Sequence, residues 1–286
     1  MLMVAILVRC AHGKDASATT LSRLLTNAFP ALPDPSDVAG VCRWLHSAAR
    51  LSNRITVSVI GHSSQGREIL GVVAEGDMLP RHVVPTVAII CRQHGDEPAP
   101  TLAALELILD IATNIDPNKH DLLQQMRFVI VPIASPDGAI AHHRFVLGGK
   151  NPNRDWGIFQ LPETRCLEAY LRKKHPDVLL DCHELLPVDY ETHAYIEFAT
   201  GSAKLARCIL NEERIDCCQA ELGHTASDCP PTLLYRYFSS SCHKSSVMLE
   251  SALVGDGQIE ARTRMHRAAT WAAAKYVVQQ TRLVRR

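Results

Sequence analysis

Apolar runs and amphipathic stretches alternate along most of the chain. Seven short runs, rich in apolar and β-branched residues, predict strands. Six stretches with apolar residues at helical spacing predict helices. The predicted strands cover 55–60, 69–74, 84–91, 127–133, 178–182, 193–199 and 246–250, and the predicted helices cover 36–49, 98–111, 121–126, 163–174, 203–213 and 259–280.

This alternation predicts a single α/β domain. Most of the strand runs are apolar on both faces, which is typical of a sheet covered by helices on both sides. Alternating strands and helices favour a mixed, mostly parallel sheet. The length of 286 residues alone favours just under two domains, but no repeat, low-complexity tract or linker follows residue 36. We therefore expect one domain over 36–286, preceded by an N-terminal extension over 1–35.

The composition excludes several classes of protein. Apolar residues make up 47% of the chain and charged residues 21%, as in an ordinary globular protein. Thirty Lys and Arg balance thirty Asp and Glu, so no net positive charge is available to hold nucleic acid. No run of 18 apolar residues is present, and we expect no membrane span.

The ten cysteines favour a reducing compartment, and we expect a cytoplasmic protein. No CxxC pair is present, and Cys91 and Cys182 stand inside apolar runs, where a thiol usually serves as a small buried hydrophobe. The apolar run from Leu2 to Val8 is a weak candidate for a signal peptide, because it is short and lacks a basic start.

A first group of candidate metal ligands follows the strand predicted at 84–91. His94 leaves the end of this strand, and Glu97 enters the start of the next predicted helix, where Pro98 suits a first turn. In open α/β sheets, ligands bind beyond the carboxyl ends of the strands. An imidazole and a carboxylate three residues apart can converge on one cation such as zinc. A polar loop with a capping carboxylate is an equally good interpretation of this segment alone.

A second strand, predicted at 178–182, ends in the same way. His183 follows it directly, and Asp181 stands two residues earlier. A lone histidine at a strand end is more often a structural residue than a ligand. Two histidines at equivalent strand ends, with a glutamate close to one of them, favour the His₂Glu set of zinc hydrolases, which leaves one position for water.

Candidate groups for a carboxylate substrate lie between and after these segments. Arg144 and Arg154, the latter next to Asn153, carry planar guanidinium groups that suit a carboxylate. A solvated loop arginine is the other interpretation of Arg144. Glu250 closes the apolar run 246–250, where a carboxylate needs a partner or an open cleft.

Six short motifs occur in order between about residues 60 and 250. They are GHSSQGR at 61–67, HGDE at 94–97, SPDG at 135–138, NR at 153–154, DCH at 181–183 and VMLES at 247–251. Together they resemble the zinc carboxypeptidase family, the metallocarboxypeptidases with a funnel-shaped active site. The resemblance implies one α/β domain around a mixed sheet of about eight strands.

The resemblance also implies a role for each matching residue. Glu250 would be the general base that takes a proton from the metal-bound water and passes it to the leaving amine. Asn153 and Arg154 would bind the terminal carboxylate of the substrate, and Arg144 would stabilise the developing oxyanion. One zinc ion would be bound by His94, Glu97 and His183.

Two positions depart from the family's pattern or compete with it. Asn151 stands where many members have an aspartate that bonds a ligand histidine, and its amide oxygen is a weaker acceptor. Glu184 is a rival to Glu250 as the base.

Two further choices are left open. The family often has a mobile tyrosine before the last strand, for which Tyr235 and Tyr237 are both candidates as substrate-binding residues. A second metal has three candidate ligands, Asp96, Glu184 and His193.

We therefore expect a zinc metallocarboxypeptidase that hydrolyses the C-terminal peptide or isopeptide-like bond of a peptide, or acts on a small carboxylate. The aspartoacylase and succinylglutamate desuccinylase group is an alternative, because it shares the HGxE motif and hydrolyses N-acyl amino acids. The GR pair at 66–67 and the SPDG turn favour the peptidase. A non-catalytic binding protein on the same fold is a third possibility, which the full set of ligands and a base disfavour.

Overall fold

A computed structural model describes residues 29–76, 84–113, 117–146, 148–185, 194–212, 221–225, 230–252 and 259–284. The described residues form one eight-stranded sheet with the order β1-β2-β4-β3-β5-β8-β6-β7. Most of the predicted extension over 1–35, and the candidate ligand His193, lie outside the described residues. The strands are β1 (Ile55–His62), β2 (Glu68–Glu75), β3 (Thr86–Cys91), β4 (Arg127–Val131), β5 (Val178–Glu184), β6 (Tyr195–Phe198), β7 (Glu221–Thr225) and β8 (Ser245–Ser251).

The sheet is mixed and mostly parallel, as predicted. Parallel pairs join β3 to β4 and to β5, β5 to β8, and β6 to β7. Antiparallel pairs join β1 to β2, β2 to β4, and β6 to β8. The central strands β3 and β5 are buried along their whole length, which explains why β3 is apolar after Thr86 and why β5 begins with three apolar residues; the polar residues of β5 gather toward its carboxyl end.

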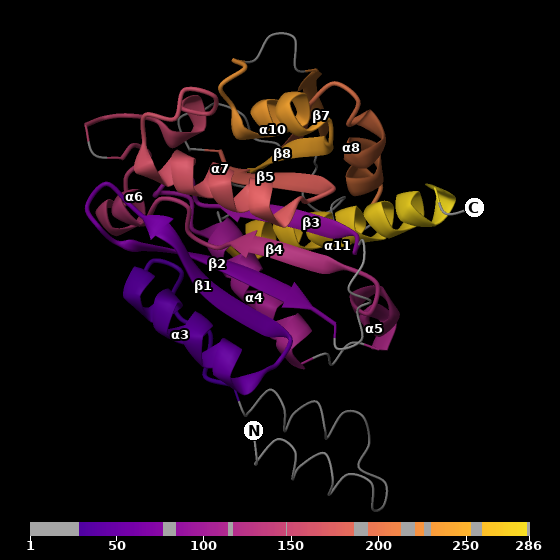
Figure 1. The fold of residues 1–286 in the computed structure, drawn as a ribbon, viewed down its shortest axis with the longest axis horizontal. Helices are drawn as coiled ribbons and strands as arrows, with labels where there is room; N and C mark the ends of the chain where they lie inside the picture. Colours follow the sequence, from indigo (N-terminus) through magenta and orange to yellow (C-terminus); the bar gives the residue numbers. More distant parts are fainter. Residues whose placement is uncertain are drawn as a thin grey trace, which may run out of the picture.

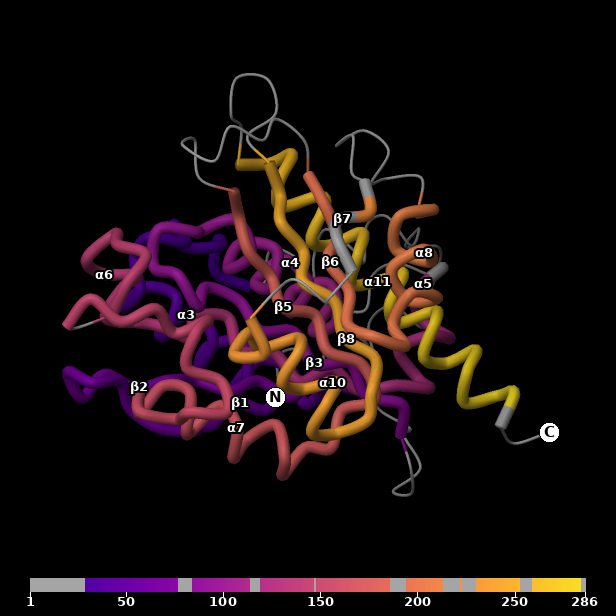
Figure 2. Tube along the Cα trace, turned by 90° about the horizontal axis from the view of Figure 1, so that it is seen from above, coloured from indigo at the N-terminus to yellow at the C-terminus, as the bar shows by residue number. Residues whose placement is uncertain are grey.

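Helices cover both faces of the sheet (Figure 1, Figure 2). One face packs against α3 (Val38–Leu51), α4 (Ala99–Thr113), α8 (Ala203–Leu210) and α11 (Ile259–Val284). The other face packs against α7 (Pro162–Lys174) and α10 (Leu234–Cys242). The shorter elements are α5 (Pro117–Leu123), α6 (Pro136–Ala141) and the 3₁₀ turn η1 (Pro152–Arg154). None of the helices in the described part of the chain is both long and apolar enough to cross a membrane.

The helix α3 illustrates how local sequence sets an element. Asp37 caps it by accepting a bond from the N–H of Gly40 (2.9 Å). Val41, Trp44 and Ala48 then recur at helical spacing and are buried against the sheet. The predicted start at residue 36 is thus two residues earlier than the observed one.

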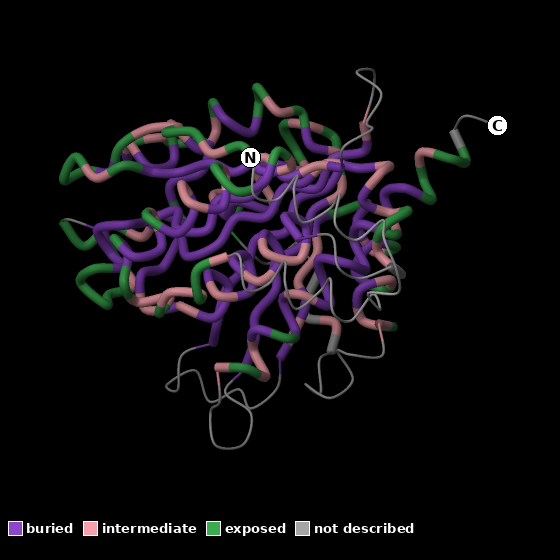
Figure 3. The backbone as a smooth tube through the Cα atoms, turned by 90° about the horizontal axis from the view of Figure 1, so that it is seen from below, coloured by how far each residue is buried: buried purple, intermediate pink, exposed green. Residues whose placement is uncertain are grey.

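Strand register brings distant residues to one edge of the sheet. Cys91 of β3 is the register partner of Cys182 of β5, and His183 of β5 is the partner of Glu250 of β8. Figure 3 shows that buried residues fill the interior of the molecule, and these four residues are among them. Because all three strands run in parallel, their carboxyl ends meet at one place, which is where the candidate ligands follow them.

Candidate metal centre

The turn between β3 and α4 positions the first two candidate ligands. Arg92 follows β3 with a φ of 55°, a left-handed conformation that turns the chain sharply. Its fully buried guanidinium donates to the carbonyl oxygen of Gly95 from Nε (3.1 Å) and Nη2 (3.0 Å), and to the carbonyl oxygen of Pro35 from Nη1. This side chain ties the turn that holds His94 and Glu97 to the segment before α3.

Gly95 fits this turn because there is no space for a side chain. A Cβ at Gly95 would lie 1.8 Å from the carbonyl carbon of Gly138 in α6. The N–H of Gly95 donates to the carbonyl oxygen of His143 (3.1 Å). The SPDG motif, which contains Gly138, therefore forms part of the support of the HGDE turn.

His94, Glu97 and His183 converge. Nδ1 of His94 lies 2.7 Å from Oε1 of Glu97, and Nδ1 of His183 lies 2.8 Å from Oε2 of the same carboxylate. The two imidazole rings are 4.7 Å apart between centroids. All three side chains are buried, and one ligand atom from each lies within 4.8 Å of the others.

Oxygen acceptors hold the outer nitrogen of each histidine. Nε2 of His94 donates to Oδ1 of Asn151 (2.9 Å), and Nε2 of His183 donates to Oδ1 of Asp181 (2.9 Å). The Asn151 oxygen also accepts a bond from the N–H of Asn153 (2.8 Å), which fixes the orientation of its amide. Because these oxygens accept, each Nε2 carries the proton and each Nδ1 is left to face Glu97. Asn151 thus makes the histidine contact expected of it.

The charges at this centre favour a cation between the three side chains. Burial alone raises the pKa of Glu97, but His94 and His183 hold it well below its usual range. Burial alone lowers the pKa of His183, but Asp181 and Glu97 raise it well above its usual range. Two imidazole lone pairs facing a carboxylate at these distances repel unless a proton or a metal ion stands between them. Two nitrogens, one carboxylate and fixed tautomers fit zinc.

Glu250 lies beside this centre on the neighbouring strand. It lines a cavity of about 320 Å³ together with His94, Arg144 and Arg154. Its side chain is nearly buried, and burial raises its pKa to about 8, with the negative charges of Glu97 and Asp181 adding to the shift. Such a carboxyl can both take and release a proton near neutral pH.

The two arginines in this cavity differ in their partners. Nη1 of Arg144 donates to Oε1 of Glu97 (3.0 Å), so this guanidinium lies next to the metal centre. Nη1 of Arg154 donates to the main-chain oxygen of Asn153 (2.8 Å). Both arginines line the cavity, which provides a positively charged wall for an anionic group.

A model of the zinc carboxypeptidase family matches residues 41–204, more than half of the chain. The chain belongs to the zinc carboxypeptidase family. The resemblance predicted from the six motifs is thereby confirmed.

Individual relatives match parts of this chain. Carboxypeptidase 2 of Trichophyton rubrum is 32% identical over 91 residues, which cover 32% of this chain and 17% of that protein. Zinc carboxypeptidase A 1 of Drosophila melanogaster is 28% identical over 130 residues, covering 40% of this chain and 30% of that protein. The matched region thus spans less than a third of either relative.

Solved structures share the fold. A metallo-carboxypeptidase from Burkholderia cenocepacia aligns with a TM-score of 0.70 and 18% identity, covering 83% of this chain and 68% of that chain. Thrombin activatable fibrinolysis inhibitor aligns with a TM-score of 0.71 and 15% identity, covering 91% of this chain and 80% of that chain. The predicted single α/β fold around a mixed sheet is confirmed.

Two candidate substrate-binding residues, Tyr235 and Tyr237, are not among the residues that line the cavity. The hydroxyl of Tyr235, a fully buried residue of α10, donates to Oε2 of Glu197 (2.9 Å). Tyr237 packs against Phe159, with ring centroids 5.2 Å apart. The tyrosine that lines the cavity is Tyr195, the register partner of Glu250 on β6. Its strand was predicted, but nothing in the sequence showed that it borders Glu250.

Asn153 is more deeply buried than its predicted role suggests. Its Oδ1 accepts a bond from the N–H of Leu234 (2.9 Å), and its Nδ2 lies 2.9 Å from Nε2 of His183. The amide thus holds the start of α10 through its oxygen, and its Nδ2 donates to Oδ2 of Asp181 (3.4 Å). Asn153 also lines the cavity, so its role toward substrate stays a prediction.

Glu184 and the proposed second metal gain little support. Oε1 of Glu184 accepts a bond from the N–H of Ala99, and its Oε2 lies 3.1 Å from Nε of Arg262. These contacts occupy the carboxylate at the start of α4, which leaves Glu250 as the better placed base. Within the ranges that the structure describes, the only group of three ligands close enough to share a metal ion is His94, Glu97 and His183.

Gln93 completes the support of the metal centre and was not predicted. Its Nε2 donates to Oδ1 of Asp181 (2.6 Å), and its Oε1 accepts a bond from Nε1 of Trp156 (2.8 Å). A glutamine at a strand end has no distinctive sequence signal, so only the structure reveals that it orients Asp181.

Proposed function

We propose that this protein is a zinc-dependent metallocarboxypeptidase that hydrolyses the C-terminal peptide bond of a peptide. The observation that supports this best is the convergence of His94, Glu97 and His183 beside Glu250, in a cavity that also presents two arginines. His94, Glu97 and His183 would bind the zinc ion, which when bound polarises a water molecule and the scissile carbonyl.

The protein's own groups supply the remaining steps. Glu250 takes a proton from the attacking water and then donates it to the nitrogen of the leaving amine. Burial raises its pKa to about 8 in the metal-free protein, and a divalent cation bound beside it would lower this value and make the carboxylate available as a base near neutral pH. The carboxylate therefore acts first as a base and then as an acid.

The two arginines stabilise negative charge on the substrate. Arg154 binds the terminal carboxylate of the substrate, assisted by the position of Asn153 beside it. Arg144, which lies next to Glu97, donates to the oxygen that becomes negative during attack. Tyr195 borders Glu250 and is better placed than Tyr235 or Tyr237 to contact a substrate.

We also propose a reducing, cytoplasmic location. The described cysteines are free thiols, and Cys91 and Cys182 are buried. An oxidising compartment would favour disulfides among so many thiols.

A substrate panel tests the proposed activity. The purified protein is assayed with peptides and with N-acyl amino acids, before and after metal removal by a chelator. We expect release of the C-terminal residue from peptides, loss of activity with the chelator and recovery with zinc. Cleavage of N-acyl amino acids alone would show that the peptidase proposal is wrong.

The variant Glu250→Gln tests the role of the base. We expect kcat to fall by about 10²- to 10⁴-fold, because an amide cannot take a proton, while the bound zinc stays near one per chain. Lys275→Gln, a surface change on α11, is the matched control and should leave kcat unchanged. An unchanged kcat in Glu250→Gln would show that Glu250 is not the base, and absence of turnover in both proteins would indicate a non-catalytic member of the family.

A further inference from the structure

A second, larger cavity lies at the opposite edge of the sheet from the metal centre. Its volume is about 690 Å³, against about 320 Å³ for the cavity beside Glu250. Four lining residues stand at or next to the start of the central strands: Thr86, Arg127, Asp177 and Lys244. The last turn of α7 forms another wall. Parallel strands begin at this cavity and end at the metal centre, so the two sites share no residue.

The lining of this cavity is strongly basic. It contains one carboxylate, Asp177, and five arginines and lysines, together with His175. Oδ2 of Asp177 already accepts a bond from the N–H of Thr86 (3.0 Å), and its Oδ1 lies 2.9 Å from Nζ of Lys244. The five cationic residues are Arg127, Arg172, Lys173, Lys174 and Lys244.

Two more of these five cationic residues, Arg127 and Arg172, have carboxylate partners just outside the lining. Nε of Arg127 lies 2.6 Å from Oε2 of Glu75, and Arg172 pairs with Glu168. Lys173 and Lys174 differ, because neither has a carboxylate partner among the residues that the structure describes. The Lys173–Lys174 pair is therefore the uncompensated part of the cavity.

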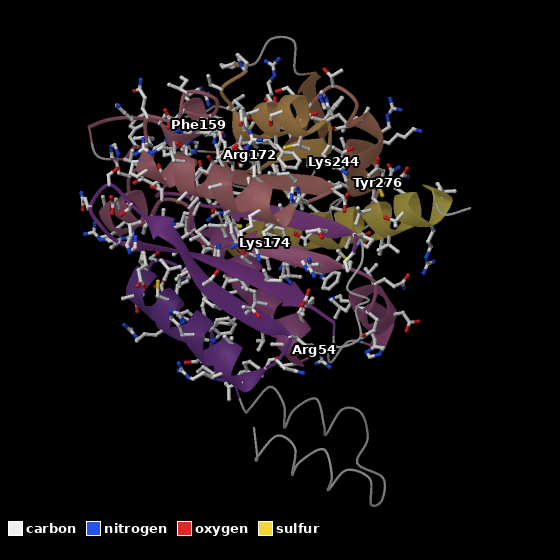
Figure 4. All side chains as sticks on the ribbon, in the orientation of Figure 1. Arg54, Phe159, Arg172, Lys174, Lys244 and Tyr276 are labelled. Carbon is white, nitrogen blue, oxygen red and sulfur yellow. The ribbon has the colours of Figure 1, made fainter. Side chains whose placement is uncertain are left out.

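The surroundings of Lys174 show that positive charge is crowded here. Its Nζ lies 5.5 Å from the centre of the Tyr170 ring. Burial lowers the pKa of Lys174, and the positive charges of Arg127 and Lys173 lower it further. An anion bound in the cavity would relieve this repulsion. Figure 4 labels Arg172 and Lys174 on α7 and Lys244 at the start of β8.

Helix stabilisation explains only part of this cluster. Basic residues in the last turn of α7 offset the negative end of the helix dipole. Arg127 and Lys244 come from other elements and are not needed for that purpose, yet they line the same cavity. Leu171, Pro176 and Phe238 add apolar walls, as in sites that enclose a small molecule.

We propose that this cavity binds a small anion with several negative charges, a phosphate ester or a polycarboxylate, through Lys173 and Lys174. Charge-assisted hydrogen bonds from the two ammonium groups hold the anionic groups, and the apolar walls contact the rest of the molecule. The volume lies in the range of small-molecule sites, which favours a small ligand over a polymer. This inference does not depend on the proposed peptidase activity.

Isothermal titration calorimetry of the zinc-loaded full chain at low ionic strength tests the site. Fructose 1,6-bisphosphate and propane-1,2,3-tricarboxylate are the two anionic probes and distinguish phosphate from carboxylate ligands, and fructose is the uncharged control. We expect at least one anion to bind with a stoichiometry of one and fructose not to bind. Absence of binding by both anions at millimolar concentration, or equal binding of fructose, would overturn the proposal.

Two charge-matched double variants locate the site. Lys173→Gln with Lys174→Gln should weaken anion binding by roughly tenfold or more, because each lysine loses a charge-assisted bond. Lys204→Gln with Arg207→Gln removes the same charge from exposed positions on α8 and should change the Kd less than twofold. Equal weakening in both pairs would show a general surface effect and contradict the site.

A third variant separates the cavity from the metal centre. Arg154→Gln alters the catalytic cavity and should leave binding of the anion unchanged. If Arg154→Gln abolished binding while the lysine pair had no effect, the anion would occupy the catalytic cavity and the proposal would be wrong. Thermal unfolding of each variant, without the anion, checks that it is folded.

Discussion

Arg92 combines a left-handed backbone with a fully buried guanidinium, directly before the metal-binding turn. Few side chains adopt its φ of 55° without strain. Burial lowers the pKa of Arg92 to about 10, a value at which the group is still charged at neutral pH. Its hydrogen bonds to the carbonyl oxygens of Gly95 and Pro35 compensate for the backbone strain and for the burial of the charge. Arg92 is thus a positioning residue that acts through the turn.

Replacing Arg92 separates backbone strain from side-chain contacts. Arg92→Gly suits the left-handed backbone but removes the guanidinium, so we expect roughly tenfold weaker zinc binding, as for other residues that orient ligands. Competition with a chromophoric chelator measures the zinc affinity. His175→Gly, at a φ of 48° on the cavity remote from zinc, is the control and should bind zinc normally. An unchanged affinity in Arg92→Gly would refute the positioning role.

Glu184 makes a pH-dependent contribution to the free energy of unfolding, and the burial of its side chain sets the sign. Burial raises its pKa to about 7, above the value of about 4.3 in an unfolded chain. Between these two values the unfolded state releases the proton and the folded state keeps it. Stability therefore falls as pH rises from about 4 to 7, by up to about 1.4 kcal/mol per pH unit from this group.

The variant Glu184→Gln tests this pH dependence. In the metal-free protein, the free energy of unfolding of the variant should rise relative to wild type between pH 5 and 7 and then level off. Urea denaturation at unit pH intervals measures it. Loss of the contact to Arg262 adds an offset that does not vary over this range, so only the slope is diagnostic. A constant difference across the range would contradict the raised pKa.

At the level of elements, the contact between the β3–α4 turn and α6 is the tightest part of the site. Gly95→Ala would place a methyl group 1.8 Å from the main chain of Gly138. Because backbone must move, we expect a loss of about 2 kcal/mol in stability and weaker zinc binding. Urea denaturation and chelator competition measure the two effects.

A second glycine provides the comparison. Gly40→Ala in α3 meets only the side chain of Asp37. If that side chain rotates, loss of its N-cap bond costs about 1 kcal/mol, which the higher helix propensity of alanine largely offsets, so stability should change by less than about 1 kcal/mol. Equal effects of the two substitutions would mean that α6 does not constrain the metal-binding turn.

The predicted elements were those whose pattern is strong in isolation. The seven predicted strands and six predicted helices all overlap observed elements, and most ends differ by a few residues; the helix predicted at 121–126 overlaps α5 only over 121–123. The elements β7, α6 and α10 were not predicted. The helix α6 begins with Pro-Asp-Gly, which is typical of a turn, and α10 ends in serines, which favour loops. Both are held by packing, which local sequence does not encode.

The sequence predicted those residues of the candidate site that have a recognisable ligand chemistry and stand at the ends of predicted strands. His94 and Glu97 follow β3, and His183 and Glu250 lie near the carboxyl ends of β5 and β8, so their proximity follows from the fold. Arg92 and Gln93 act through contacts with segments distant in the sequence, and such contacts have no local signature. The choice between tyrosines required the register of β6 against β8, which places Tyr195 beside Glu250.

For the whole molecule, zero net charge conceals two oppositely placed cavities. One, at the carboxyl ends of the strands, mixes arginines with buried carboxylates around the metal centre. The other, at the amino ends, is lined by five arginines and lysines and one carboxylate. A chain without a long-range field can therefore still bind anions at two separate places, which the total composition could not show.

The register of β3 against β5 also has a consequence for how the protein folds. It pairs Cys91 with Cys182, so the turn that holds His94 and the strand that ends in His183 meet only after a long loop has closed. Contacts of this range form late, because the chain entropy of loop closure is lost before any pairing energy is gained. In the unfolded chain, His183 is far from His94 and Glu97, so the three ligands form no single metal site. Zinc therefore acts on the folded state, stabilising it by about 1.4 kcal/mol for each tenfold excess of free metal over its Kd.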